Sequence, residues 1–304
     1  MAEERSQSAH GGRLYKSVVV GVPYLWLLVF FFVPFLIVLK ISLSTTTIAQ
    51  PPYLPVFDFD LASVLAGVKE FVPDNYGFLF GDPLYIDAYL SSLRIAATST
   101  ALALLVGYPF AYGMAKAPAG LRPVLLMLTI LPFWTSFLIR VYAWIGILKN
   151  EGLLNQFLLW TGLIHEPLSI LNTEVAVYIG IVYSYLPFMV LPIYSSLERM
   201  DHRLIEAAND LGCPPAKAFW RITLPLSLPG VLAGTFLVFI PAVGEFVIPD
   251  LLGGSDTLMI GKTLWDEFFN NRDWPVASAV AVILLLVLVI PIVFFQRSQA
   301  KVER

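Results

Sequence analysis

Glu245 is the one carboxylate that lies well inside a long apolar run of this sequence. An ionisable group is expensive to bury at membrane depth, so such a residue is a candidate functional site by default. Pro241 and Pro249 flank it, and Gly244 lies beside it. The two prolines loosen the helical hydrogen-bond ladder, and broken backbone at this depth is tolerated mainly where it lines a cavity or packs on protein. The chemistry that a carboxylate offers in this setting is the binding of a cation.

Arg140 offers a structural alternative, in which it forms an ion pair with Glu245. At about 1.5 Å per helical residue, Glu245 lies about 24 Å along a run that starts at Pro229, and Arg140 lies about 26 Å along a run that starts at Pro123. The two side chains could therefore meet. Arg140 could instead extend to the lipid headgroups, so the sequence leaves Glu245 open between a ligand pathway and a structural pair.

No catalytic or metal-binding constellation accompanies this carboxylate in the sequence. The chain has one cysteine and three histidines, which lack metal-ligand spacing: Cys213, His10, His165 and His202. Gly261-Lys262-Thr263 resembles the end of a nucleotide-binding loop, but Asp256 stands where that motif needs a glycine. We therefore predict a protein that is not an enzyme and has no catalytic residue, metal or cofactor of its own. Without a run of basic residues, it has no predicted nucleic-acid partner.

The elements that position these residues are long apolar segments of the chain. Of the 304 residues, 58% are hydrophobic and only 13% are charged. A soluble domain is nearer a quarter charged, and crossing a bilayer takes about 20 apolar residues. We predict an all-α membrane protein, surrounded by lipid, with six transmembrane helices: Val18–Leu39, Ala88–Met114, Pro123–Leu148, Val175–Leu197, Pro229–Leu252 and Val276–Phe295. The Pro-rich segment Ser42–Asp87 is expected to form a cap with short helices.

Charges in the connecting loops alternate in sign, as the positive-inside rule describes. Lys and Arg gather at both ends of the chain and after the second and fourth runs, whereas the opposite loops are acidic. We expect both termini in the cytoplasm, as tails of residues 1–17 and 296–304 around one transmembrane domain, 18–295. The acidic outer face suits a surface that meets a cation, although acidic residues are also simply tolerated there.

The loop between the fourth and fifth runs predicts a helical hairpin. Apolar residues at i, i+3, i+4 and i+7 share one face of a short helix: Leu204, Ala207, Ala208 and Leu211. Asp201 can cap its start, and Gly212 can end it in a left-handed conformation. Pro214 and Pro215 block continuation, so a second short helix from about Ala216 to Ile222 must leave at an angle. Such a knob suits docking to another protein or, alternatively, lying on lipid headgroups.

This loop resembles the signature of permease subunits in binding-protein-dependent ABC importers. Glu206-Ala207-Ala208 is followed after three residues by Gly212 and, nine residues later, by Ile222-Thr223-Leu224-Pro225. The resemblance implies a type I ABC importer permease fold, in which this loop, about residues 199–225, is a coupling helix that fits a cytoplasmic ATPase. The implied ATPase-coupling residues are Glu206, Ala207, Ala208, Gly212, Ile222, Leu224 and Pro225.

Three further segments resemble the putrescine and spermidine permeases of that family: Leu131–Trp144, Phe239–Gly254 and Asn270–Ala279. The resemblance implies a polyamine importer of the bacterial inner membrane, in which this chain pairs with a second permease subunit as a heterodimer. It also implies a cytoplasmic ABC ATPase dimer that binds ATP and Mg, and an extracytoplasmic polyamine-binding protein. The alternatives are another cargo, such as iron, sulfate, thiamine or phosphonate, and a secondary transporter powered by an ion gradient.

A polyamine is a flexible multivalent cation, so its path should offer carboxylates for the ammonium groups and aromatic faces along the methylene chain. We expect Glu245 in that path, with these further candidates: Trp134, Tyr142, Trp144, Tyr183, Tyr185, Asp250 and Trp265. Each aromatic residue could instead belong to an interfacial belt or to packing. Asp250 and Trp265 could instead belong to an ordinary solvated loop.

Overall fold

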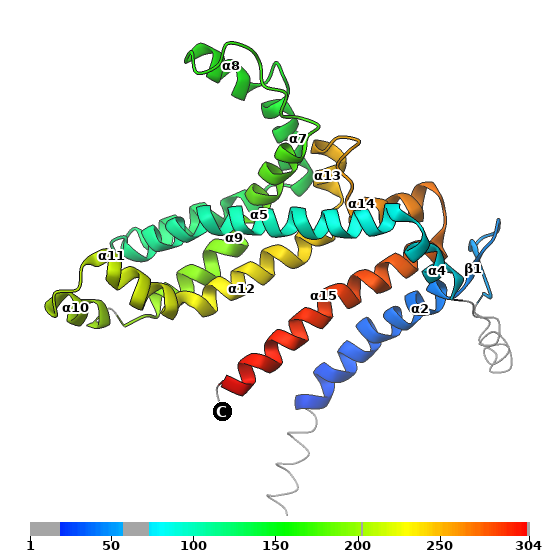
Figure 1. Cartoon of the computed structure of the whole chain (residues 1–304). Helices are drawn as coiled ribbons and strands as arrows, with labels where there is room; N and C mark the ends of the chain where they lie inside the picture. Colours follow the sequence, from blue (N-terminus) through cyan, green and yellow to red (C-terminus); the bar gives the residue numbers. More distant parts are fainter. Residues whose placement is uncertain (1–18, 57–72, 202, 303–304) are drawn as a thin grey trace, which may run out of the picture. The chain divides into compact units, whose positions relative to one another are not determined.

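The computed structural model describes residues 19–56, 73–201 and 203–302. The predicted N-terminal tail, 1–17, lies outside these residues, as do residues 303–304 of the C-terminal tail. The chain divides into two compact units, one formed by the residues up to Asp82 together with those from Asp266, and the other by Pro83–Trp265. Figure 1 draws both units.

The first unit is built on two long helices that contact each other. The first helix, Val19–Ser42, contains a π-helical turn, η1 (Leu28–Phe32), followed by α2 (Val33–Ser42). α2 packs on α15 (Trp274–Val302), which follows the π-helical turn η5 (Asp266–Asn270). These helices correspond to the first and last predicted spans.

A small cap joins the ends of these two helices. It contains α4 (Asp74–Gly81) and an antiparallel hairpin of β1 (Thr45–Thr46) and β2 (Tyr53–Leu54). The Asn75 amide donates to the carbonyls of Ser42 at 2.9 Å and Ser44 at 2.8 Å, and the Thr46 hydroxyl donates to Asp273 at 2.7 Å. α4 is a short helix of the kind predicted for this segment, whereas the hairpin was not predicted, and residues 57–72 lie outside the described part.

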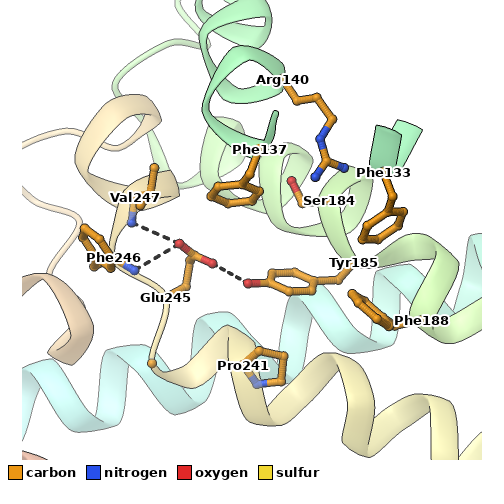
Figure 2. A pocket seen from close by; sticks show the side chains of 11 residues that line it. Phe133, Phe137, Arg140, Ser184, Tyr185, Phe188, Pro241, Glu245, Phe246 and Val247 are labelled. Atoms are coloured by element: carbon orange, nitrogen blue, oxygen red, sulfur yellow. Dashed lines mark hydrogen bonds between the residues drawn. The ribbon is translucent and has the colours of Figure 1, made fainter. Parts of the chain in front are cut away.

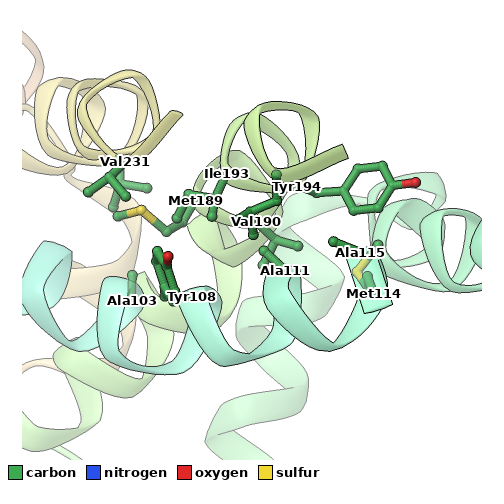
Figure 3. Packing of buried hydrophobic residues seen from close by; sticks show 12 residues of the cluster. Ala103, Tyr108, Ala111, Met114, Ala115, Met189, Val190, Ile193, Tyr194 and Val231 are labelled. Carbon is green, nitrogen blue, oxygen red and sulfur yellow. The ribbon is translucent and has the colours of Figure 1, made fainter. Parts of the chain in front are cut away.

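The second unit has a core of three long helices, α5 (Pro83–Lys116), α9 (Glu174–Glu198) and α12 (Leu224–Val243), which pack on one another. Figure 3 shows their buried side chains interdigitating. Small residues allow the close approach, as is common between membrane helices. At Gly230, for example, a Cβ atom would lie only 2.5 Å from the carbonyl oxygen of Pro192.

The third predicted span, Pro123–Leu148, is not one continuous helix. α6 (Arg122–Ile130) tightens into the 3-10 turn η3 (Leu131–Trp134), and after a break the chain resumes as α7 (Phe137–Leu148) and α8 (Leu153–Trp160). The two halves are bent by 90°. Thr135 has extended backbone and its hydroxyl bonds the Pro132 carbonyl at 2.8 Å, so local polar bonding replaces the helical ladder at this point.

The segment before α12 also differs from the prediction. α10 (Arg203–Asp210) is the first helix of the hairpin, as expected. The second helix was predicted to be separate and to span Ala216–Ile222, but α11 (Pro215–Ala218) and the π-helical turn η4 (Phe219–Thr223) run into α12 as one helix, Pro215–Val243. Pro225 lies inside this continuous helix, directly after the π-helical turn η4, so the wider turn adjoins the residue that has no N–H to donate.

Two short helices, α13 (Val247–Leu252) and α14 (Ile260–Trp265), follow α12. They lie at the end of the three-helix core opposite to α10 and α11 (Figure 1). Four helices of the described chain are long and apolar enough to cross a membrane, and the bent pair would make a fifth crossing. α15 contributes a shorter described apolar stretch, Trp274–Val289, and the arrangement is consistent with six spans.

Candidate functional site

The fifth predicted span, Pro229–Leu252, breaks at Glu245. α12 ends at Val243, Gly244 leaves the helical conformation, and α13 starts at Val247. Pro249 favours the break, because its ring would crowd the carbonyl of residue 245 in a continuous helix and it has no N–H to donate. The same proline is tolerated in the first turn of α13, where the N–H groups have no helical partner.

The Glu245 carboxylate fills the place left by the interrupted helix. Its Oε1 accepts the backbone N–H groups of Phe246 at 3.2 Å, Val247 at 3.0 Å and Ile248 at 3.4 Å. Its Oε2 accepts the hydroxyl of Tyr185 on α9 (Figure 2). With only 7% of its surface exposed, Glu245 therefore caps α13 and links it to α9.

Glu245 lines a cavity of about 490 Å³ between α7, α9 and the α12–α13 break. Aromatic rings dominate the lining, which includes Phe133, Phe137, Tyr185, Phe188 and Phe246. Figure 2 shows these rings arranged around the space beside the carboxylate. One carboxylate among aromatic faces is a chemical match for a cation with an apolar chain.

Arg140 reaches the same cavity without pairing with Glu245. No ion pair within 4.0 Å joins the two among the described residues, so the alternative of a structural pair is not realised here. The guanidinium carbon instead lies 5.0 Å from the ring centre of Phe133 and 5.7 Å from that of Phe137, at cation-π distance. In the described structure its buried Nε and the buried Ser184 hydroxyl have no hydrogen-bond partner. The cavity is thus lined by a carboxylate, Glu245, and a guanidinium, Arg140, that do not pair with each other.

The predicted pathway residues, all of which are described, separate into three groups. Glu245 and Tyr185 line the cavity and touch each other. Trp144 and Tyr183 pack edge to face, with ring centres 5.3 Å apart, and Trp134 and Tyr142 are 73% and 57% exposed on the surface of the unit. These four do not line the cavity, and their placement fits packing or an aromatic belt.

The third group comprises the two candidates beyond the break, Asp250 and Trp265. Trp265 stacks on Phe246 with ring centres 4.5 Å apart, so it backs one cavity wall. Asp250 pairs with Lys262 at 3.2 Å. Neither residue joins the cavity lining.

Sequence reasoning did not select Phe133, Phe137 and Phe188. Helical spacing would have found two of them, because Phe137 lies three residues before Arg140 and Phe188 three residues after Tyr185, on shared helix faces. Phe133 joins them only through the bend after η3, which no apolar pattern marks.

The helical hairpin is capped as the sequence predicts. Asp201 Oδ1 accepts the N–H of Arg203 at 3.0 Å, and Gly212 adopts a φ of +78°. The N–H of Gly212 bonds the Asn209 carbonyl and that of Cys213 bonds the Ala208 carbonyl, both at 2.9 Å. These two bonds form a Schellman motif, which ends α10 sharply.

The predicted coupling residues of the hairpin present an accessible surface. Glu206 and Ala207 are exposed, Ala208 is half-buried, and the neighbouring Leu211 is 89% exposed. Ile222 and Leu224 are half-buried, and Pro225 is exposed. Their role in contacting an ATPase stays a prediction.

Comparisons with known proteins identify the relatives of this chain. Residues 10–301 match the family model described as binding-protein-dependent transport system inner membrane component. The chain is 42% identical to the spermidine/putrescine transport system permease protein PotB of Salmonella typhimurium (strain SL1344). The match covers 93% of this chain and 93% of that one. It is 43% identical to the PotB protein of Escherichia coli (strain K12), covering 90% of this chain and 94% of that one. A bacterial ABC transporter involved in alginate import has a similar fold, with a TM-score of 0.66, 17% identity, and coverage of 98% and 99%.

Proposed function

This chain belongs to the family of binding-protein-dependent transport system inner membrane components, and we propose that it is a permease subunit that imports polyamines such as putrescine or spermidine. It is a multi-pass inner-membrane protein and a transport component, not an enzyme. One observation carries the proposed cargo: relatives that are 42% and 43% identical over at least 90% of the chain bear the name of a spermidine/putrescine permease.

The cavity beside Glu245 supports a cationic cargo. An ammonium group that approaches Oε2 competes with the Tyr185 hydroxyl, and the methylene chain then lies against the rings of Phe133, Phe137 and Phe188. Arg140 repels the same ammonium group from the far side of the cavity. Attraction and repulsion together favour weak, transient binding, which suits a pathway through which cargo must leave as readily as it enters.

The proposed assembly has four kinds of component. This chain pairs with a second permease subunit, an ATPase dimer that binds ATP and Mg docks on the hairpin, and a polyamine-binding protein delivers cargo on the opposite side. Both termini and the hairpin face the cytoplasm, as the distribution of Lys and Arg supports. Glu206, Ala207, Ala208, Gly212, Ile222, Leu224 and Pro225 form or support the ATPase contact.

Uptake by vesicles that contain the full assembly tests this proposal. Labelled putrescine and spermidine are compared with iron, sulfate, thiamine and phosphonate, each with its own candidate binding protein. We expect ATP-dependent uptake of a polyamine alone. Uptake of another cargo with no polyamine uptake would contradict the proposed cargo while leaving the family membership in place.

Glu245→Gln tests the proposed pathway separately from the assembly. Gln keeps the shape and can still accept N–H groups from α13, but it lacks the charge that attracts an ammonium group, so polyamine uptake should fall. Glu166→Gln makes the same chemical change in an exposed loop and should leave uptake unchanged. Equal uptake by the Glu245→Gln variant and the intact chain would remove Glu245 from the pathway.

A further inference from the structure

Phe219 lies at the point where the hairpin joins the helical core. It is the first residue of the π-helical turn η4, and its ring meets two tyrosines of α5 edge to face, at 5.7 Å from Tyr108 and 5.5 Å from Tyr112. Such edge-to-face pairs stabilise the packing beyond the burial of their surface. π-helical turns within α-helices occur frequently at functional sites. Phe219 thus fixes the start of the Pro215–Val243 helix to α5.

Tyr108 makes a second contact with the same helix. Its hydroxyl lies 2.9 Å from the hydroxyl of Ser227, and both residues are buried. Figure 3 shows Tyr108 within the core, among residues from α9 and α12. Because Phe219 and Ser227 hold one tyrosine from two places about two helical turns apart, α5 cannot slide past this helix without breaking one of the contacts.

The hairpin is rigidly connected to this pair of contacts. α10 packs on α11 and on η4, and the Schellman turn, which ends at Cys213, leaves only Pro214 before the start of α11. A force on α10 therefore reaches Phe219 through folded, packed structure and not through a flexible linker.

The opposite end of α5 lies against the Glu245 break. The Ser92 hydroxyl of α5 accepts the N–H of Ile260, the first residue of α14, at 2.7 Å. The next residue, Gly261, packs so closely that a Cβ atom there would lie 2.4 Å from the Gly244 carbonyl oxygen. α5, which is about 50 Å long, thus links the hairpin to the backbone that positions Glu245.

We propose that Phe219, through its contacts with Tyr108 and with α5, is the positioning residue that couples ATPase motion at the hairpin to the cavity beside Glu245. This inference rests on the proposed function, because it assumes an ATPase that moves the hairpin. Phe219 contacts neither cargo nor nucleotide. Its role is to make α5 follow the hairpin.

Phe219→Ala in the full assembly tests the coupling. The measured quantities are the amount of ATPase that co-purifies, the rate of ATP hydrolysis, and the cargo imported per ATP hydrolysed. We expect bound ATPase and hydrolysis to persist while import per ATP falls by about fivefold or more, within the usual range of coupling between distant sites. Tyr108→Phe, which removes the bond to Ser227 and keeps the ring, should cause a smaller fall.

Phe110→Ala is the matched control, because Phe110 lies between the two tyrosines on α5 but is 58% exposed. It should leave import per ATP unchanged. If Phe219→Ala imports as much per ATP as the intact chain, or if it loses ATPase binding altogether, Phe219 is not a coupling residue.

A cargo-independent measurement separates this inference from the proposed function. With Cys213→Ser removing the single cysteine, Ser184→Cys places a thiol in the cavity lining. ATP should change the labelling rate of that thiol in the intact chain and not in Phe219→Ala. The expected difference between the two chains does not depend on the cargo being a polyamine. If ATP changed the labelling rate equally in both chains, the coupling role of Phe219 would be overturned.

Discussion

In the proposed function, holding α13 and binding cargo compete for the same two oxygens of Glu245. Oε1 holds the first turn of α13 through backbone N–H groups, and Oε2 is shared with the Tyr185 hydroxyl. A carboxylate has about four lone-pair sites, so little capacity is left for cargo in this conformation. The Tyr185 hydroxyl is the bond most readily given up, because it can rotate while the backbone donors cannot.

Tyr185→Phe should therefore improve cargo binding. The change removes the donor at Oε2 and keeps the aromatic face, so the apparent KM for a polyamine should fall by about fivefold, the equivalent of one hydrogen bond of about 1 kcal/mol. Uptake kinetics in vesicles measure it. Tyr178→Phe is the control, because Tyr178 donates to Glu174 on the same helix at 3.2 Å, away from the cavity. A raised KM for Tyr185→Phe alone would mean that the hydroxyl binds cargo directly.

Gly212 should be required for its conformation and not for its size. Its φ of +78° disfavours a side chain, although no atom lies within 4 Å of the place where a Cβ would be. Gly212→Ala should cost about 1–2 kcal/mol of local stability and loosen ATPase binding, whereas Gly212→Asn should do less because asparagine tolerates this region. Gly162→Ala, with a φ of +71° and similarly open surroundings, is the control. The amount of ATPase that co-purifies with each variant measures this effect. If Gly212→Ala retained as much ATPase as the intact chain, this role of Gly212 would be contradicted.

At the scale of elements, apolar runs predict where helices lie but not whether their backbones are continuous. The second and fourth spans are single helices as predicted, Pro83–Lys116 and Glu174–Glu198. The third and fifth spans break, at Thr135 and at Glu245. Apolar runs do not predict these breaks, because hydropathy reports burial and carries no information on hydrogen bonding. Pro249 was a usable signal for the second break, whereas the bend after Trp134 depends on local polar bonds that composition does not reveal.

The packing of α9 on α12 should be sensitive to a single methyl group. Gly230→Ala would place a Cβ 2.5 Å from the Pro192 carbonyl oxygen, so it should lower the free energy of unfolding by about 1–3 kcal/mol. Gly113→Ala lies in a helix with open space around the new Cβ and should be neutral or stabilising by up to about 1 kcal/mol. Thermal unfolding of the purified protein compares the two, and equal midpoints would contradict the close packing.

The hairpin should lose accessibility when an ATPase binds. Cys213 directly follows Gly212, is partly exposed, and is the chain's one cysteine, so it is a natural reporter that needs no mutation. Its reaction with a thiol reagent, followed by mass spectrometry, should slow several-fold in the complex relative to the permease alone. An unchanged rate in a complex that is demonstrably intact would place the ATPase elsewhere.

At the scale of the whole molecule, the chain is an inner membrane component of a binding-protein-dependent transport system. The sequence signature at Glu206–Pro225 predicts the family, and the match over residues 10–301 confirms it. The cavity could be predicted only in part, since Glu245 is conspicuous in sequence whereas its aromatic neighbours come together through bends in two spans.

The most direct test is cargo accumulation in vesicles whose ion gradients have been collapsed, using assemblies with either an active ATPase or one that cannot hydrolyse ATP. With the binding protein outside, we predict polyamine accumulation with the active ATPase and none with the inactive one. Accumulation that persists with the inactive ATPase, or that needs an ion gradient, would contradict ATP-driven import and favour a secondary transporter.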